Sequence, residues 1–448
     1  MTRLPSSAER RAAGEQVRSK VPLGEHAIWK AEADRPDPVA LLESQASTRI
    51  PSLVPVRYGR MAVSPFTFLR GAALPMAADL ATTKSSGITV QLCGDAHLSN
   101  FGLFASPERD LVFDINDFDE TIRGPFEFDV KRLAASLVVA GRSRGFNTHQ
   151  NAHTVHAAVR TYRERMAEYA SMRAIDIFYA RVDAASILAY VDKRARPFLQ
   201  STVKSASHHD ALHELPKLTE VGPDGERRIV DHPPVIRHVD VEIPFQQAAL
   251  ESYIDTLQED RRLLVERYRL VDAALKVVGV GSVGLGAYAC LLDGGGGEDP
   301  LFLQVKQAEA SVYERFLGPS EYSDHGQRVV IGQRCLQAVS DILLGWTTGP
   351  HGRNLYVRQL QDQKGGAVVE AMTADDLESW GELCGWALAR GHARSGDPAM
   401  IAGYLGTDSE FDHAIGDFAA AYADQTERDH AAFQAAIASG RIVAQSGV

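Results

Sequence analysis

Two short acidic segments contain the residues best suited to bind a metal ion. GDAHLSN (94–100) contains Asp95 and Asn100, and FDINDFDE (113–120) contains Asp114, Asp117 and Asp119. Carboxylate and amide oxygens suit a hard cation such as Mg²⁺, which keeps several waters and bridges to phosphate oxygens. Asp and Asn are also favoured in turns for local reasons, so two solvated turns are the structural alternative.

A glycine-rich segment, Gly279-Val-Gly281-Ser282-Val-Gly284, is flanked on both sides by strand-like sequence. A dinucleotide-binding turn would need a helix directly after the third glycine, whereas the following LGAYACLL alternates like a strand. The segment therefore favours a glycine-rich hairpin that covers phosphates. A tight hairpin without a ligand is the alternative.

Lys306 lies in the apolar segment LFLQVKQA (301–308). A lysine is a poor choice for a strand buried on both faces unless its ammonium group meets an anion. The alternative is an edge-strand lysine that discourages aggregation.

The elements that must position these residues follow from hydrophobic periodicity. Residues 1–50 are polar, charged and interrupted by prolines, so we expect a loosely attached lead-in with one short helix and no chemistry. We expect an irregular connection at 200–245. Spacing of three to four residues between apolar positions predicts helices in 64–80, 128–175, 247–276, 326–346 and from 375 to the end.

Strand-like sequence precedes each acidic loop, at GITVQL (87–92) and LVFDI (111–115). We expect these two strands to be neighbours, which would bring the acidic loops together. The segment from Val277 to Gln307 predicts a small antiparallel sheet, and NLYVRQL (354–360) predicts a further strand.

Composition and charge limit the possible partners. A chain of 448 residues exceeds the size at which one core stops growing, so two lobes are expected. The formal charge of −11 disfavours nucleic-acid binding. The four cysteines are widely spaced, which disfavours a disulfide framework or a zinc site and fits a reduced cytoplasm. We expect no signal peptide, membrane helix or membrane partner.

The acidic loops resemble those of the aminoglycoside-phosphotransferase and choline-kinase type of the protein-kinase-like superfamily. This resemblance implies that Asp95 is the catalytic base and that Asn100 and Asp117 bind the metal ion. GPFEFDVKRLA (124–134) resembles a further segment of these enzymes and implies that Asp129 is a structural carboxylate. The whole sequence also resembles a bacterial family of unknown function, which implies no substrate.

The glycine-rich hairpin and Lys306 resemble the small lobe of the same superfamily, where that lobe precedes the catalytic loop. Here it follows the catalytic loop, which implies a circular permutation that leaves the site intact in space. The resemblance implies catalytic roles for Asp95 and Lys306. The residues expected to bind the nucleotide are Gly279, Gly281, Ser282, Gly284 and Lys306.

Two positions depart from the pattern of these enzymes. Cys93 stands where they usually carry histidine. The glutamate that usually pairs with the lysine is not obvious in this sequence. Glu314 is near Lys306 along the chain, while the later helix offers only Gln327 and Gln333.

Other polar residues are expected to have structural roles. His97 is interpreted as a structural hydrogen-bonding residue, and His392 and Asp397 as helix-end features. Arg60, Arg70 and Arg358 lie in segments that should approach the cleft, where bidentate contacts to a phosphate or an acidic substrate are the alternative to ordinary ion pairs.

We therefore expect an α+β, two-lobed, circularly permuted protein-kinase-like fold. Its parts are a lead-in (1–50), the first part of the large lobe with both acidic loops (51–240), a small nucleotide-binding lobe (241–365) and C-terminal helices of the large lobe (366–448).

The expected function is transfer of phosphate from ATP or another NTP, with Mg²⁺, to an unknown hydroxyl acceptor that is a small molecule or a protein. The alternatives are a metal-dependent phosphohydrolase, a nucleotide-binding pseudokinase and a nucleotidyltransferase.

Overall fold

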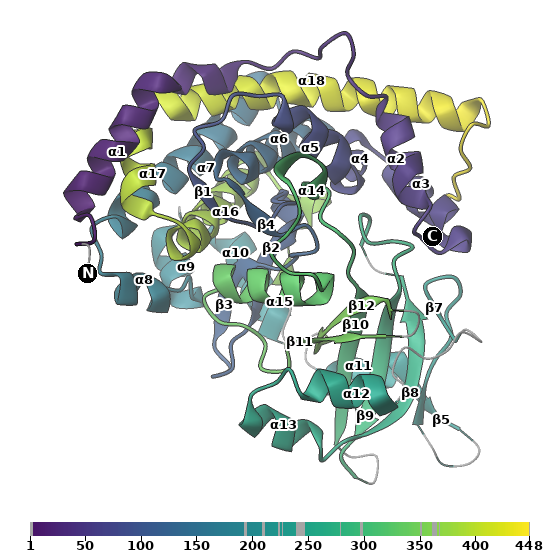
Figure 1. Ribbon diagram of the computed structural model, residues 1–448. Helices are drawn as coiled ribbons and strands as arrows, with labels where there is room; N and C mark the ends of the chain where they lie inside the picture. Colours follow the sequence, from purple (N-terminus) through teal and green to yellow (C-terminus); the bar gives the residue numbers. More distant parts are fainter. Residues whose placement is uncertain are drawn as a thin grey trace.

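The protein consists of a helical lobe and a lobe built on one larger sheet, as the computed structural model shows (Figure 1). Together they form an α+β protein that is mainly helical and has small antiparallel sheets. The structure describes residues 3–191, 195–207, 211–222, 225, 227–238, 247–277, 279–295, 299–349, 352–360, 365–366 and 368–447.

Helices from two distant parts of the chain build the core of the helical lobe. They are α6 (Glu127–Ser143), α7 (Thr148–Tyr169), α16 (Ala374–Ser395), α17 (Pro398–Leu405) and α18 (Glu410–Ala438). Helix α16 packs along α7, and α18, at the top of Figure 1, packs on α6 and α7. Trp380 and Leu137 are buried in this core. The helices predicted in 128–175 and after 375 are confirmed.

The N-terminal segment is packed on this lobe, so the expectation of a loosely attached lead-in is wrong. Helix α1 (Ser7–Lys20) lies on α17, and η1 (Leu23–Ala27) lies on α18. Arg35 donates to both Asp79 and Asp429 at 2.6–2.8 Å. Arg10 likewise pairs with the distant Asp397, and the local sequence does not reveal such partners.

His26 of this segment is expected to make the stability of the fold sensitive to acid. Its Nε2 lies 2.7 Å from the Tyr404 hydroxyl, and burial, aided by Lys131, lowers the pKa of His26 to about 3. The folded state holds this ring neutral while the unfolded chain takes up a proton near pH 6.5, so stability is lost as pH falls below about 6.5.

His26→Phe should remove this loss because it has no titratable ring. Between about pH 7 and about pH 5, the unfolding free energy of the variant should fall less steeply than that of the wild type, by up to about 1.4 kcal/mol per pH unit. Chemical denaturation at several pH values measures the difference. Parallel curves for the two proteins would contradict it.

Four further helical segments connect the lead-in to the first acidic loop. The helix predicted in 64–80 forms but is broken at Ala72 into two helices. The segments are α2 (Pro38–Ala46), η2 (Pro51–Leu53) with α3 (Val54–Met61), α4 (Pro65–Gly71) and α5 (Ala73–Ala81).

The two acidic loops lie at one end of a β-hairpin. Strands β2 (Phe101–Ala105) and β3 (Leu111–Ile115) pair antiparallel, with Phe101 opposite Ile115, so the loop before β2 meets the loop after β3. The predicted partner β1 (Thr89–Leu92) pairs instead with β4 (Ile122–Pro125). The meeting of the loops is confirmed and the strand pairing is wrong, because residues 101–105 form a strand of their own.

In the described part of the sheet lobe, six antiparallel strands lie in the order β11-β12-β10-β9-β8-β7. The sequence predicted a helix as far as residue 276, but Arg269–Lys276 is a strand. Apolar residues on both faces of this strand remove the alternation that marks a half-buried strand. The strands are β7 (Ile236–Arg237), β8 (Arg269–Lys276), β9 (Ala287–Asp293), β10 (Pro300–Gln307), β11 (Gly345–Thr348) and β12 (Asn354–Gln359).

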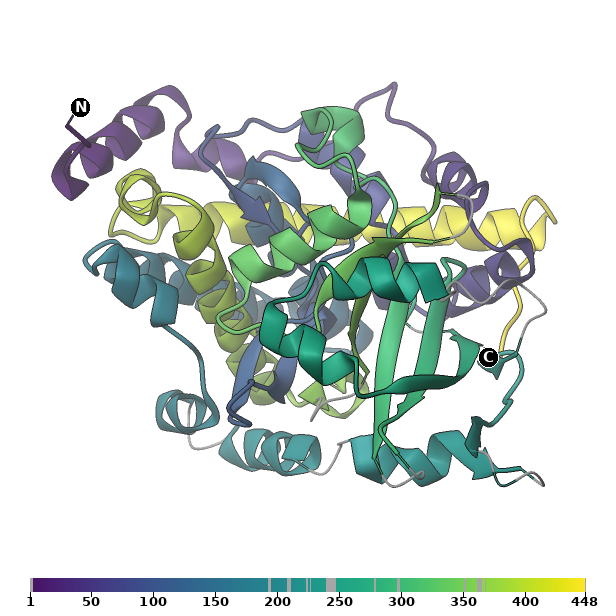
Figure 2. The same ribbon diagram turned by 60° about the horizontal axis from the view of Figure 1, so that its bottom comes forward.

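The two faces of this sheet have different coverings. One face, with Leu303 and Val305, packs under α12 (Gln247–Ile254) and α13 (Glu259–Val265), which lie in front of the sheet in Figure 2. On the other face, Phe302 and Leu291 pack against apolar residues of the connection, among them Leu218, Ile229 and Ile236. Strand alternation places Lys306 on the same face as Phe302.

The connection contains regular elements, so the expectation of an irregular segment at 200–245 is wrong in part. Residues 208–210, 223–224, 226 and 239–245 lie outside the described residues. Polar character predicted a loop, but the apolar side chains of this connection cover the sheet. Helices α8 (Ala174–Tyr179) and α9 (Ala184–Tyr190) precede the connection. The elements of the connection are α10 (Arg196–Ser207), α11 (Ala211–Leu218), β5 (Thr219–Val221), β6 (Arg227–Ile229) and β7.

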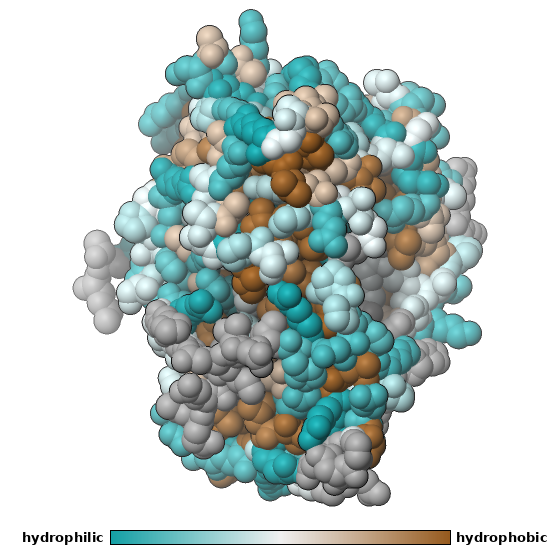
Figure 3. Space-filling model, turned by 90° about the vertical axis from the view of Figure 1, so that its right-hand side faces the viewer, coloured by the Kyte–Doolittle hydropathy of each residue, from teal (hydrophilic) through white to brown (hydrophobic). Residues whose placement is uncertain are grey.

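The remaining elements are short and lie in both lobes. They are η3 (Leu98–Asn100), α14 (Glu314–Leu317), α15 (His325–Leu336), β13 (Gly365–Gly366) and η5 (Val369–Ala371). The helix predicted in 326–346 therefore ends at Leu336. On the side shown in Figure 3, hydrophilic residues cover much of the surface and hydrophobic residues gather near its middle.

Within the part of the chain that the structure describes, no helix is both long enough and apolar enough to cross a membrane.

Candidate functional site

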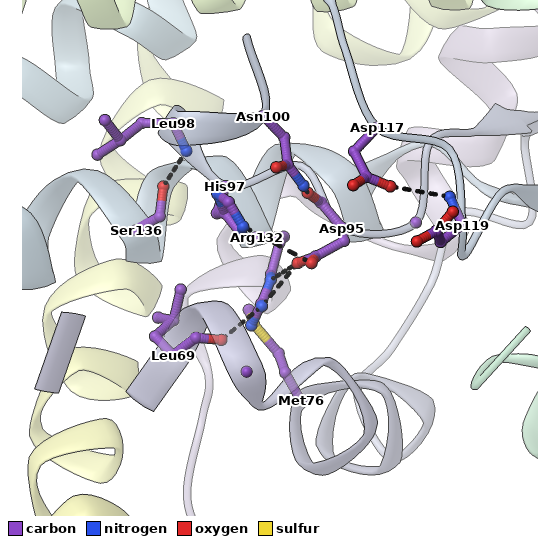
Figure 4. Close-up of polar contacts among 12 residues, drawn as sticks. Leu69, Met76, Asp95, His97, Leu98, Asn100, Asp117, Asp119, Arg132 and Ser136 are labelled. Atoms are coloured by element: carbon purple, nitrogen blue, oxygen red, sulfur yellow. Dashed lines mark hydrogen bonds and ion pairs between the residues drawn. The ribbon is translucent and has the colours of Figure 1, made fainter. Parts of the chain in front are cut away.

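The two acidic loops are hydrogen-bonded to each other. The Asn116 N–H donates to the Asn100 carbonyl at 2.8 Å. The Asn100 amide nitrogen donates to the Asp95 carbonyl at 2.8 Å, and Asp117 accepts from the Asp119 N–H at 3.0 Å. Asp95, Asn100 and Asp117 consequently line one pocket (Figure 4).

Asp95 is held from behind by an arginine that the sequence did not single out. Arg132 Nη2 donates to Asp95 Oδ1 at 2.7 Å, and the same nitrogen donates to the Leu69 carbonyl. The Asp95 side chain is 16% exposed. Burial raises the pKa of Asp95 to about 6 although Arg132 opposes the rise. A carboxylate with this pKa is suited to general-base chemistry near neutral pH.

The oxygens at this point fit a magnesium ion better than zinc. Among the described residues, no group of three or more His, Cys, Asp or Glu side chains is arranged to hold a metal ion by itself. Asp117 and the amide oxygen of Asn100 offer a carboxylate and a neutral oxygen in the same pocket. Mg²⁺ accepts such a sparse protein set, because water and phosphate oxygens complete its octahedron.

Lys306 meets this acidic cluster across the interface of the two lobes. Its Nζ lies 2.7 Å from Asp119 Oδ2 and 3.9 Å from Asp117 Oδ2, although 187 positions separate Lys306 from Asp119. The Tyr356 hydroxyl donates to the second oxygen of Asp119 at 2.7 Å. Burial alone would lower the pKa of Lys306, but the Asp119 carboxylate outweighs it and the pKa is raised.

The acidic partner of Lys306 comes from the second acidic loop, and the expected candidates lie elsewhere. Glu314 accepts from the Ser311 N–H, Gln333 donates to Gln337, and the Gln327 N–H donates to Asp324. A partner from another lobe leaves no local pattern, so sequence spacing could not identify Asp119.

Asp114 and Asp129 are structural carboxylates. Asp114 is buried and accepts from Arg390 at 2.7 Å and from the Ala338 N–H, so it does not belong to the pocket cluster in which the sequence placed it. Asp129 accepts from the N–H groups of Cys93 and Gly94 at 2.8 and 3.0 Å. Asp129 thereby fixes the start of the loop that carries Asp95.

Gly94 allows the two acidic loops to approach each other. Its φ is +85°, and an added Cβ would lie 2.2 Å from the Glu120 carbonyl oxygen. Gly94→Ala should therefore push the loops apart and lower the unfolding free energy by about 2 kcal/mol or more. Thermal unfolding measures this effect, with the remote Gly87→Ala as the control, because Gly87 also has a positive φ but no neighbour near its Cβ. Equal losses in the two variants would contradict it.

The glycine-rich segment closes one side of the pocket. Gly279, Gly281 and Ser282 line it, between β8 and β9, while Gly284 lies beside Arg49. The N-terminal part of the chain holds the segment: the Ile50 N–H donates to the Gly284 carbonyl at 2.8 Å.

The arginines expected near the cleft do approach it. Arg60 donates to the Gly279 carbonyl at 2.6 Å, and Arg70 lines the pocket. Arg358 joins the lobes by donating to Gln304 and to the Asn116 carbonyl at 2.9 and 3.0 Å. Arg49 and Arg57 also line the pocket, and sequence reasoning missed both because no motif surrounds them.

The histidines and Asp397 have the structural settings expected of them. His97 is buried beside Asp95, and burial, aided by Arg70 and Arg132, lowers the pKa of His97 well below its ordinary value. His392 lies between the Tyr162 hydroxyl and Asp129 at 2.9 and 3.3 Å. Asp397 caps the N-terminus of α17.

The fold and the site define a two-lobed α+β protein in which a lysine of the sheet lobe meets the acidic loops of the helical lobe. The chain belongs to the family described as "Uncharacterized protein conserved in bacteria (DUF2252)", whose model matches residues 49–436. Comparisons with curated proteins and with solved structures give no match.

Proposed function

We propose that this protein transfers phosphate from ATP or another nucleoside triphosphate, with Mg²⁺, to a hydroxyl acceptor. The observation that carries the proposal is the 2.7 Å contact between Lys306 and Asp119, directly beside Asp117, Asn100 and Asp95. Phosphoryl transfer requires a protein to position the phosphates and to stabilise their charge. The buried lysine beside the carboxylates and the glycine-rich segment that lines the pocket can together meet these requirements.

Each residue has a distinct role in this proposal. Asp117 and Asn100 would hold Mg²⁺, which neutralises charge on the phosphates. Lys306 and the backbone of Gly279, Gly281 and Ser282 position the phosphates, and Gly284 shapes the segment. Asp95, oriented by Arg132, accepts the proton of the attacking hydroxyl.

We further propose that the architecture is a circularly permuted kinase-like fold. The supporting observation is the antiparallel sheet carrying Lys306, which is continuous in sequence but follows the acidic loops. Helices before residue 180 and after residue 373 jointly build the helical lobe, as one rotation of the chain order would require. Cys93, Cys290, Cys335 and Cys384 are all free, which agrees with a cytoplasmic location.

Nucleotide binding is the first test of this function. ATP and GTP should raise the melting temperature in the presence of Mg²⁺, because a ligand that binds only the folded state stabilises it once its concentration exceeds the dissociation constant. ATP labelled at the γ-phosphate should then transfer its label to an acceptor or to water. The absence of a melting shift with every nucleotide tested would contradict the proposal.

A further inference from the structure

Two buried arginines, Arg49 and Arg57, and the half-buried Arg70 line the pocket beside the acidic loops. Arg49 precedes η2, Arg57 lies on α3 and Arg70 ends α4, and the pocket that they share with Asp117 has a volume of about 80 Å³. Arg57 is 1% exposed and Arg49 is 8% exposed. The N-terminal part of the chain therefore brings cationic side chains to a site whose other side chains are mainly acidic.

These guanidinium groups have unused hydrogen-bond donors. Within the described ranges, the Nε and Nη1 atoms of Arg57 and the Nε atoms of Arg49 and Arg70 are buried and have no hydrogen-bond partner. The bonds that Arg49 and Arg57 do form go mostly to backbone carbonyls: Arg49 donates to Val283 and Arg57 to Gly71.

Largely buried arginines elsewhere in the described residues are paired with carboxylates, although Arg328 reaches Glu314 only at 3.7 Å. Arg35, Arg132 and Arg390 each form ion pairs at 2.6–2.7 Å. In contrast, Arg49, Arg57 and Arg70 form no ion pair among the residues that the structure describes. A buried cation without an anion is unfavourable, so an anion that binds at this point would explain the group.

Among the described residues, no carboxylate of the pocket forms an ion pair with these arginines, although Asp95, Asp119 and Glu120 attract them at longer range. Asp117 lies 3.9 Å from Lys306. Asp95 is engaged by Arg132, and Asp119 is engaged by Lys306. Glu120 accepts from the Val312 N–H, and burial raises the pKa of Glu120 to about 7, which reduces its negative charge near neutral pH.

We propose that Arg49, Arg57 and Arg70 form a binding subsite for a phosphoryl group, next to Asp117 and Asn100. Guanidinium groups match tetrahedral phosphate oxygens through paired N–H donors. The formal charge of the chain is −11, so these arginines form a local site rather than part of a basic surface. The subsite depends on the proposed function only for the source of the phosphoryl group, which is the nucleotide or a phosphorylated acceptor.

Isothermal titration calorimetry with inorganic phosphate, tripolyphosphate, MgATP and AMP tests the subsite. The variants are Arg57→Lys, which keeps the charge but loses the planar fork, and Arg70→Gln, which alters a less buried side chain. Arg334→Gln is the matched control, because Arg334 is also partly buried but donates to the Leu344 carbonyl outside this pocket. Circular dichroism and thermal melts show that each variant is folded.

Both pocket variants should bind tripolyphosphate at least about tenfold more weakly than the wild type, whereas Arg334→Gln should bind it unchanged. A parallel loss of MgATP affinity with AMP unaffected would identify the nucleotide as the source. A loss confined to inorganic phosphate and tripolyphosphate would identify an acceptor-borne phosphoryl group.

Equal affinity of wild type and folded pocket variants for every phosphate probe would overturn the subsite, as would a wild type that binds no phosphate probe. A wild type that binds tripolyphosphate through these arginines, but neither ATP nor GTP, would contradict the proposed nucleotide dependence while the subsite stands. The two proposals can therefore fail separately.

Discussion

Replacing Lys306 by methionine is expected to lower the phosphotransfer rate at least about 100-fold and the unfolding free energy by about 3 kcal/mol. The side chain keeps its length but loses the ammonium group that meets Asp119 at 2.7 Å. Without it, the half-buried Asp119 carboxylate loses its nearest cation, and the phosphates lose a positioning charge. Labelled-phosphate transfer and chemical denaturation measure the two effects.

Lys131→Met is the matched control, because Lys131 is also buried but lies on α6, over the Phe418 ring. This control should leave the rate unchanged. Adding Asp119→Asn to Lys306→Met should restore much of the stability and none of the activity, since it removes the unbalanced charge but not the need for the lysine. A folded Lys306→Met protein with the wild-type rate would contradict the proposed role.

Asp117→Asn is expected to reduce the Mg²⁺-dependent rate about 1000-fold while leaving stability nearly unchanged. In the wild type, the Asp119 N–H donates to Asp117 at 3.0 Å. Asparagine retains an oxygen that can accept this hydrogen bond but loses the charge that binds the cation. Rates measured over a series of Mg²⁺ concentrations give the metal dependence.

Asp110→Asn is the control for this variant, because Asp110 lies in the turn of the same hairpin and pairs with Arg181 on the surface. Its rate and Mg²⁺ dependence should match those of the wild type. An Asp117→Asn protein with unaltered Mg²⁺ dependence would show that the cation, if required, binds elsewhere.

The same variants separate the alternatives to phosphotransfer. A metal-dependent phosphohydrolase should lose activity in Asp117→Asn but tolerate Lys306→Met, because water attack on a metal-bound substrate does not require the lysine. A pseudokinase should bind nucleotide without transfer, and Asp95→Asn should then change nothing in a sensitive labelled-phosphate assay. Mass spectrometry of the product would reveal transfer of a nucleotidyl group.

Local patterns predicted most elements but not their boundaries or partners. The helices around α7 and α16 and the strands around Lys306 have clear periodicity, and they form. The sequence predicted a helix at β8. Both faces of this strand are covered, so it carries apolar residues on both sides and lacks the alternation typical of a half-buried strand. The lead-in was expected to be loose because its charged residues find their partners, as Arg35 does, in distant helices.

The sequence by itself determined the candidate chemistry, because Asp95, Asn100, Asp117 and Lys306 occur in short segments whose residue types suit a cation and phosphate. Only the tertiary structure decided that Asp119 is the partner of Lys306, that Asp114 pairs with Arg390, and that Arg49, Arg57 and Arg70 line the pocket. The physical reason is that ion pairs depend on distance in space and on burial, and neither is encoded by spacing along the chain.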